Sequence, residues 1–178
     1  DNLGRMWFGT EEGISIYDGV QTKVYKPSEF HRQNANPIGN QTHFIAGDKD
    51  GNVFFDSDQS LIRYDIQTQK FSCLQKSNVY TVASIKGTIW VGIADSILTW
   101  NPDKNDFDFV TRLENRNQRA TCLLEDSGGR YWIGTTDGLF RMNDDKSLTC
   151  MIMGEDIYDL YEDSKYNLWI SIRMNGMY

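Results

Sequence analysis

Few residues in this chain have the types and spacing needed for acid–base or metal chemistry. There are two histidines, His31 and His43, and neither belongs to an HExxH pattern. The chain has no GxSxG elbow and no Walker sequence, and its three cysteines form no CxxC pair. These absences argue against hydrolase, nucleotide and zinc sites. We therefore predict no catalytic residue, no metal site and no cofactor in this segment.

One turn resembles part of a calcium loop. Asp48-Lys49-Asp50-Gly51-Asn52 offers several oxygen ligands, but the remaining ligands and the Glu at the twelfth position are missing. The same turn recurs elsewhere in the chain without its second Asp. We interpret it as a hairpin turn, because a short carboxylate can accept hydrogen bonds from the turn amides and Gly supplies positive φ.

Polar side chains gather in loops where they could contact a ligand. The connection near residues 27–41 carries His31 and Arg32 beside an aromatic side chain, and a second cluster has two guanidinium groups able to meet a carboxylate or sulfate in forked geometry. Short acidic turns add further candidates. The predicted ligand-binding residues are His31, Arg32, Glu11, Asp58, Arg116, Arg119 and Asp137. The alternative, solvated loops with no ligand, stays open.

A repeat positions these loops. Residues 1–10 and 126–135 carry identical or similar residues at most positions, and weaker copies share the same frame. The anchor aromatics are 36 to 47 residues apart: Trp7, Phe54, Trp90, Trp132 and Trp169. A period near 40 residues is typical of β-propeller blades, which are four-stranded sheets packed face to face. We expect these aromatics to be core residues that fill the wedge between blades.

Within one repeat the residues predict four short strands. In the second repeat they cover 42–48, 52–55, 60–64 and 70–74, each rich in β-branched or aromatic residues and bounded by turn formers. The segment Asp156–Tyr161 has apolar residues at helical spacing. Its register within the repeat matches a first strand, however, so we predict a strand there.

The predicted fold class is all-β, with about four and a half propeller blades of four-stranded antiparallel sheets. We expect a single array over residues 1–178, with a partial blade at 1–27, full blades at 40–76, 78–112 and 118–153, and a partial blade at 156–178. The two partial blades overlap in their second and third strands, so they do not complete one sheet. The array is therefore expected to be an arc of a larger propeller.

A family resemblance follows from the repeat. The pattern Asp-x-x-Gly-x-x-Trp-x-Gly-Thr, followed by Gly-(Leu/Ile) and an aromatic with Asp, resembles the two-component regulator propeller repeat. The match covers essentially the whole chain and is best around Trp132. The second repeat departs from it with Phe54 for Trp and Asp56 for Gly, and the fifth has Ser171 for Gly.

The resemblance implies a periplasmic ligand-sensing segment, the ectodomain of an inner-membrane hybrid two-component sensor histidine kinase. Its implied partners are an oligosaccharide, the remaining blades of the parent chain and a second copy in a homodimer, and its implied role is to control carbohydrate-use genes. The segment itself would be non-catalytic. The net charge of −7 and pI near 4.8 argue against nucleic acid. The longest apolar run, residues 150–153, is far too short to span a membrane, and we expect no membrane contact by this segment.

Two other functions stay open. The repeat also resembles propeller lyases or hydrolases of the streptogramin-lyase-like type, which would need a histidine with a carboxylate, and a metal, near the ring axis. His43 is the histidine close to an inner strand. The third alternative is an architectural role, in which these blades only space or dimerise the sensor.

Overall fold

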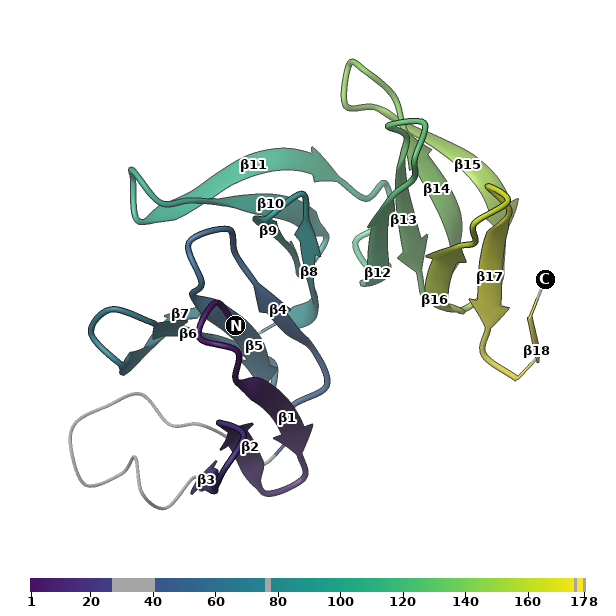
Figure 1. Ribbon diagram of the computed structural model, residues 1–178. Helices are drawn as coiled ribbons and strands as arrows, with labels where there is room; N and C mark the ends of the chain where they lie inside the picture. Colours follow the sequence, from purple (N-terminus) through teal and green to yellow (C-terminus); the bar gives the residue numbers. More distant parts are fainter. Residues whose placement is uncertain (27–40, 76–77, 175, 178) are drawn as a thin grey trace. The chain divides into compact units, whose positions relative to one another are not determined.

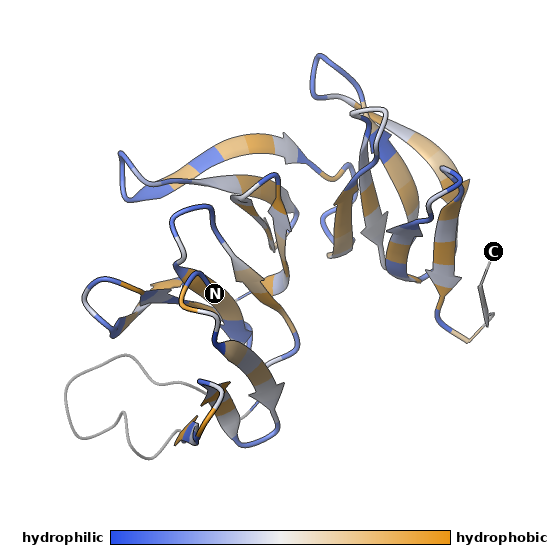
Figure 2. Ribbon diagram, viewed as in Figure 1, coloured by the Kyte–Doolittle hydropathy of each residue, from blue (hydrophilic) through white to orange (hydrophobic). Residues whose placement is uncertain are grey.

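The computed structural model describes residues 1–26, 41–75, 78–174 and 176–177. Within them the chain forms strands and turns and no helix, which confirms the all-β prediction (Figure 1). Residues 1–89 and residues 90–178 form two compact units. Hydrophobic residues concentrate on the strands and hydrophilic ones at the turns (Figure 2).

Within the described ranges, eighteen strands form five sheets, here called blades 1 to 5 in chain order. Blade 1 has three strands, β1 (Met6–Thr10), β2 (Gly13–Tyr17) and β3 (Thr22–Tyr25). Blade 2 has four, β4 (Ile45–Gly47), β5 (Val53–Ser57), β6 (Ser60–Asp65) and β7 (Lys70–Gln75). Blade 3 comprises β8 (Val79–Ile85), β9 (Thr88–Ile93), β10 (Ser96–Asn101) and β11 (Asp106–Arg112).

Blade 4 comprises β12 (Ala120–Glu125), β13 (Tyr131–Thr135), β14 (Gly138–Met142) and β15 (Leu148–Met153). Blade 5 has β16 (Ile157–Glu162), β17 (Leu168–Ile172) and β18 (Gly176–Met177). In each four-stranded sheet the strands are hydrogen-bonded in sequence order. The strand predicted at Asp156–Tyr161 is confirmed as β16, because residues 159–162 pair one by one with β17 in an antiparallel ladder rather than forming a helical turn.

Each unit has its own hydrophobic core. In residues 1–89, Trp7 on β1 packs edge-on against Tyr64 of blade 2, with ring centres 4.9 Å apart. In residues 90–178, Trp132 on β13 packs into a cluster with Ile157 and Leu160 of blade 5. In both cases the anchor aromatic of the repeat packs against the next sheet, as its predicted place between blades requires.

The prediction that all five anchor aromatics are core is wrong for Trp169. Phe54, Trp90 and Trp132 are buried and Trp7 is half-buried, but Trp169 is 41% exposed. The reason is positional: this ring lies opposite Tyr161, which is also exposed, and the described residues supply no following sheet to cover that face. Burial of an anchor aromatic therefore depends on an adjacent sheet that covers it, and not on the residue type alone.

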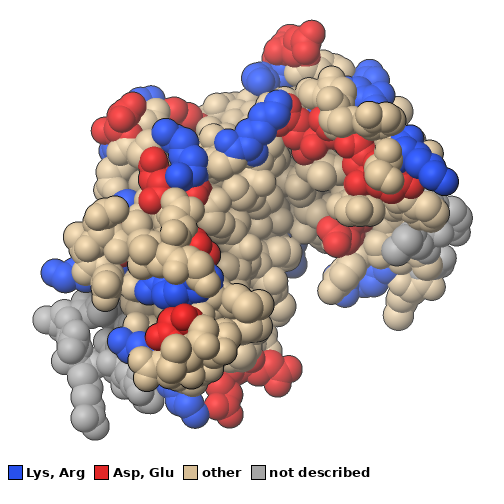
Figure 3. Space-filling model, viewed as in Figure 1, with Lys and Arg blue, Asp and Glu red and all other residues tan. Residues whose placement is uncertain are grey.

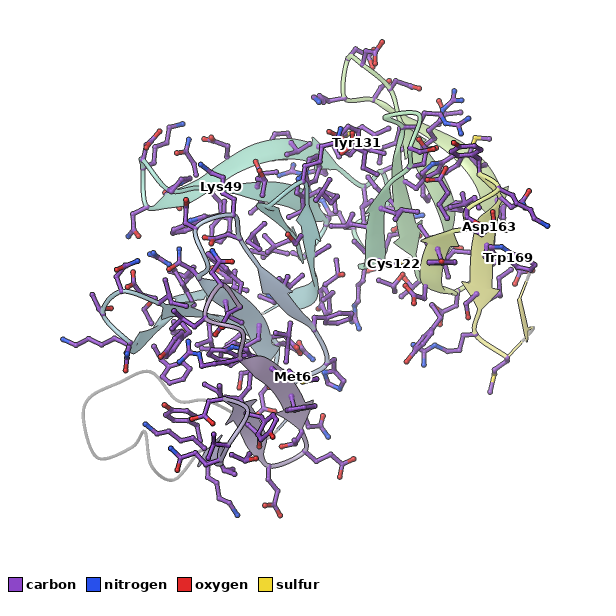
Figure 4. All side chains as sticks on the ribbon, in the orientation of Figure 1. Met6, Lys49, Cys122, Tyr131, Asp163 and Trp169 are labelled. Carbon is purple, nitrogen blue, oxygen red and sulfur yellow. The ribbon has the colours of Figure 1, made fainter. Side chains whose placement is uncertain are left out.

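The Asp that opens the repeat holds its turn and its Trp together. In blade 4, Asp126 accepts bonds from the Arg130 amide (2.9 Å), the Arg130 Nε (2.6 Å) and the Trp132 indole (2.8 Å). Asp163 does the same in blade 5, where it accepts the Trp169 indole at 2.9 Å (Figure 4). These bonds hold the pKa of the Asp163 carboxyl well below its usual range, with the Asn167 side chain the largest cause. The repeated Asp is therefore a structural residue.

The repeated Gly and Thr also serve the sheet. A Cβ at Gly134 would overlap the Cys122 Sγ and lie 2.8 Å from the Ile157 Cγ2. Gly138 has φ of +146°, and a Cβ there would overlap the Ile152 carbonyl oxygen. The Thr135 hydroxyl donates to the Gly138 carbonyl at 2.8 Å. The repeated Asp, Gly and Thr residues therefore stabilise the sheets. Side chains available to a ligand are expected where a blade differs from the repeat.

Candidate functional site

Blade 2 departs from the repeat at Asp56, which occupies the position of Gly134 in blade 4. The side chain is buried, with the residue only 3% exposed. Its Oδ1 accepts bonds from the backbone amides of His43 (2.7 Å) and Phe44 (2.6 Å). Its Oδ2 lies 3.0 Å from the His43 Nδ1. The carboxylate thus fixes both the chain entering β4 and the imidazole next to it.

The Asp56 carboxylate decides which nitrogen of His43 is free. An ionised carboxylate can only accept, so in the neutral ring Nδ1 carries the proton and Nε2 is the acceptor. The side chain of His43 is 61% exposed. A buried carboxylate therefore orients an exposed imidazole, with Nε2 available to another molecule.

His43 lines a surface pocket of about 190 Å³ between the β1–β2 turn and the start of blade 2. The pocket is also lined by Gly9, Thr10, Glu11, Gln41 and Thr42. Gly9 permits this approach, since a Cβ there would lie 2.8 Å from the Thr42 Cγ2. The pocket thus joins residues of blades 1 and 2.

Some polar groups of the pocket are already hydrogen-bonded within the protein, and others are not. The Thr10 hydroxyl is taken up by its own turn, donating to the Gly13 carbonyl (3.0 Å) and accepting from the Glu12 amide (3.2 Å). The side chains of Glu11 and Gln41 make no hydrogen bond or ion pair to another described residue. Together with the His43 Nε2 they present both donors and acceptors to the pocket.

Of the predicted ligand residues, Glu11 lines this pocket, and Asp58 does not line it but bonds the backbone of Gln41, which does. Asp58 accepts the Gln41 amide at Oδ1 (3.0 Å) and donates its own amide to the Gln41 carbonyl (3.0 Å). It positions Gln41 rather than lining the pocket. His31 and Arg32 fall outside the described residues.

The other three predicted residues surround the β13–β14 turn of blade 4, in the second unit. The Arg119 carbonyl accepts from the Thr136 amide at 3.1 Å, and Asp137 accepts from the buried Gln118 side chain at 3.4 Å. Arg116 is exposed in the preceding turn. These contacts order the turn.

Sequence reasoning missed the pairing of His43 with Asp56. The signal was present, because Asp56 breaks the Trp-x-Gly column, but the departure was interpreted as a weaker family match. Among residues 1–26, 41–75, 78–174 and 176–177, no three His, Cys, Asp or Glu side chains gather closely enough to hold a metal ion. Nor does a helix long and apolar enough to cross a membrane occur in that part of the chain.

Comparison with known proteins confirms the resemblance seen in the repeat. Residues 116–137 match the family model described as two component regulator propeller. No curated protein matches the chain.

Solved structures with similar folds include extracellular domains of bacterial signalling proteins. One, from a B. thetaiotaomicron protein described as a one-component system, aligns with 97% of this chain at 18% identity and a TM-score of 0.77. Another, from a B. thetaiotaomicron hybrid two-component system, aligns with 99% at 20% identity and a TM-score of 0.63. The chain spans 25% and 32% of the length of these two structures.

A streptogramin B lyase is also similar, over 77% of this chain and 50% of its own length, at 17% identity and a TM-score of 0.60. At these identities the likeness establishes the fold, which is that of β-propeller blades. The fold is shared by sensor domains and a lyase, so the site must distinguish the functions.

Proposed function

We propose that this chain is an extracytoplasmic ligand-sensing segment of a hybrid two-component sensor kinase, responding to a glycan fragment and regulating carbohydrate-use genes. The signalling class is supported by the regulator-propeller repeat at residues 116–137 and by the extracellular domains with similar folds. The observation that carries the ligand proposal is the oriented His43 at the mouth of a polar pocket.

The pocket chemistry suits sugar hydroxyls. A hydroxyl is both donor and acceptor, and it can donate to the Glu11 carboxylate or the His43 Nε2 while accepting from the Gln41 amide. Asp56 holds the His43 imidazole, so this side chain would lose little freedom on binding, and Asp58 holds the backbone of Gln41. A glycan contacting Glu11 on blade 1 and His43 on blade 2 would link two sheets of the same unit.

A ligand that binds the folded protein and not the unfolded chain should raise the melting temperature, with an increase that grows as the logarithm of ligand concentration above the Kd. We expect some members of a panel of neutral oligosaccharides to do so, with affinity confirmed by calorimetry. Glu11→Gln and His43→Ala should each weaken binding about tenfold, as loss of a hydrogen bond to a charged or oriented group does.

Glu12→Gln is the matched control for Glu11→Gln. Glu12 is in the same turn, but its carboxylate is paired with Lys26 at 2.9 Å and does not line the pocket. It should bind like the wild type. If Glu12→Gln and Glu11→Gln weaken binding equally, the pocket is not the site.

The pairing of His43 with Asp56 also favours a second candidate, a propeller lyase or hydrolase. A general base held in one tautomer by a buried carboxylate is a recurrent catalytic arrangement. If the glycans that bind are cleaved, release of new reducing or unsaturated ends will be seen with time, and Asp56→Asn will slow it by making His43 adopt the other tautomer. Binding without product over long incubation would support the sensor.

A further inference from the structure

A second pocket, of about 380 Å³, lies in blade 4 between the β12–β13 turn and the β14–β15 turn. Its lining includes three cationic side chains, Arg130, Arg141 and Lys146, and one acidic side chain, Asp144. This balance is opposite to that of the whole chain, whose net charge is −7. On the face drawn in Figure 3, both acidic and basic side chains are present.

Arg141 is the unusual member, because it is half-buried and its side chain forms no hydrogen bond or ion pair with another described residue. The matching residue in blade 2 is Arg63: Arg141 lies opposite Trp132 and Arg63 lies opposite Phe54. Arg63 pairs with Asp65 at 2.9 Å. The same strand position of the repeat therefore carries a neutralised guanidinium in blade 2 and an unneutralised one in blade 4.

The difference comes from one residue. Blade 4 has Asn143 where blade 2 has Asp65, two residues after the Arg. The Asn143 amide is committed to the other strand, donating to the Ser147 hydroxyl at 2.9 Å and the Thr149 hydroxyl at 3.0 Å. Asn143 thus closes the turn without supplying a carboxylate to Arg141.

The other two cations are held at the rim of the pocket. Arg130 is fixed through its Nε on Asp126, which leaves part of its guanidinium toward solvent. The Lys146 ammonium lies 5.9 Å from the centre of the Tyr131 ring (labelled in Figure 4), which is stacked on Trp90 at 5.0 Å. These contacts restrain the positive charges of Arg130 and Lys146, which line the same pocket as the unpaired Arg141 guanidinium.

We propose that this pocket binds an oxyanion, with Arg141 as its principal contact and Arg130 and Lys146 as supporting charges. A planar guanidinium matches carboxylate, sulfate or phosphate oxygens in forked geometry, and charge-assisted bonds of this kind are stronger than neutral ones. The site goes beyond the glycan pocket of the first unit and shares no residue with it.

The test is titration of the purified protein with sodium sulfate and sodium phosphate against sodium chloride at matched ionic strength, followed by calorimetry and by NMR shifts of the 128–131 and 143–147 amides. Saturable binding is expected for the wild type. Arg141→Gln should weaken it about tenfold or more.

Asn143→Asp restores the blade 2 residue and is the sharper variant, because it adds a carboxylate and leaves Arg141 in place. The new carboxylate should pair with Arg141 and weaken oxyanion binding about tenfold. The variant loses the amide donor to Ser147 and Thr149, so circular dichroism must show that it is folded. Lys104→Gln, whose ammonium pairs with Asp108 at 2.6 Å on another sheet, is the control and should bind like the wild type.

Two further arms identify the source of the oxyanion. Glucuronate or a sulfated monosaccharide that binds more tightly than the inorganic ion indicates an acidic ligand, and equal binding indicates the free ion. No saturable binding of any oxyanion by the wild type, or unchanged binding by Arg141→Gln or Asn143→Asp, overturns the proposal. His43→Ala leaves this titration unchanged, so failure here is separate from failure of the glycan pocket.

Discussion

Blades 2 and 4 have the same strand order and the same pairing, yet they present different chemistry. Both have a register shift at the same place between their third and fourth strands, at Leu61/Ile62 and at Leu139/Phe140. Blade 4 keeps Gly134, where blade 2 has the buried Asp56. The residues common to both blades maintain the sheet, and polar sites arise where one blade departs from the other.

The largest expected effect comes from placing the blade 2 residue into blade 4. In Gly134→Asp the new Cβ would overlap the Cys122 Sγ and crowd Ile157, so the core between the two sheets would have to shift to admit the side chain. We expect a loss of about 3 kcal/mol or more in the free energy of unfolding. Urea denaturation followed by circular dichroism measures it.

The control for this prediction is Gly47→Asp. Gly47 is exposed on β4, and the nearest non-neighbouring atom to a Cβ there, the Asn52 carbonyl oxygen, is 3.9 Å away. Its cost should stay within about 1 kcal/mol. Equal losses in the two variants would mean that the Gly column is not held by packing.

The next effect compares the turn carboxylates of the two blades. Asp126 accepts the Trp132 indole, whereas Phe54, at the matching position of blade 2, has no donor for Asp48. Among the described residues, the Asp48 carboxylate accepts hydrogen bonds from Asp50 and Asn52. We expect Asp126→Ala to cost about 2–3 kcal/mol and Asp48→Ala about 1–2 kcal/mol. A larger loss in Asp48→Ala would contradict the role given to the indole bond.

The Asp126 contribution should also depend on pH. Burial raises the pKa of this carboxyl, but the Trp132 indole and the Arg130 amide and guanidinium outweigh burial, so the pKa is lowered. The stabilisation is therefore complete above the unfolded value of about 3.9 and is lost as the pH falls through the folded value. The stability difference between wild type and Asp126→Ala should be smaller at low pH than at pH 7, in urea titrations.

A smaller effect on stability, with a larger one on binding, is expected when blade 2 is returned to the repeat pattern. Asp56→Gly removes the acceptor for two amides and for the His43 Nδ1. We expect a loss of about 1–2 kcal/mol in unfolding free energy and at least about tenfold weaker glycan binding, measured by urea denaturation and calorimetry. Wild-type binding by this variant would show that Asp56 does not orient His43.

The last comparison concerns the reactivity of the cysteine thiols and not the stability of the fold. Cys73 and Cys150 lie at matching positions of blades 2 and 4, half-buried and exposed respectively, while Cys122 is buried. Burial raises the pKa of the Cys122 thiol to about 12. Because the thiolate reacts and the reagent must reach it, an alkylating reagent at pH 8 should modify the exposed Cys150 far faster than the buried Cys122, as mass spectrometry can follow. Equal rates of modification of the two thiols would contradict this burial.

The repeat predicted the strands well because each motif residue has a local task. The Asp of the turn, the Gly without room for a Cβ and the Thr that bonds its own turn all act within one or two neighbouring strands, so their spacing alone indicates the sheet. The Asp156–Tyr161 strand was predicted from this register against its helical apolar spacing.

The sites were harder to predict because they depend on exceptions and on neighbours. Asp56 and Asn143 each differ from the repeat by one residue, and their meaning emerges only when the partner, His43 or Arg141, is placed in space. Burial of Trp169 could not be predicted for the same reason. Whether this ring is buried depends on a neighbouring sheet, and the repeat motif around Trp169 does not show whether one is present.

Exposure of Trp169 gives the protein an optical probe. Trp90, Trp100 and Trp132 are at most 9% exposed, so an aqueous collisional quencher reaches the Trp169 ring far more readily than theirs. A fluorescence change that disappears in Trp169→Phe would then report whatever covers β17, whether another sheet or a second protein, without any added dye.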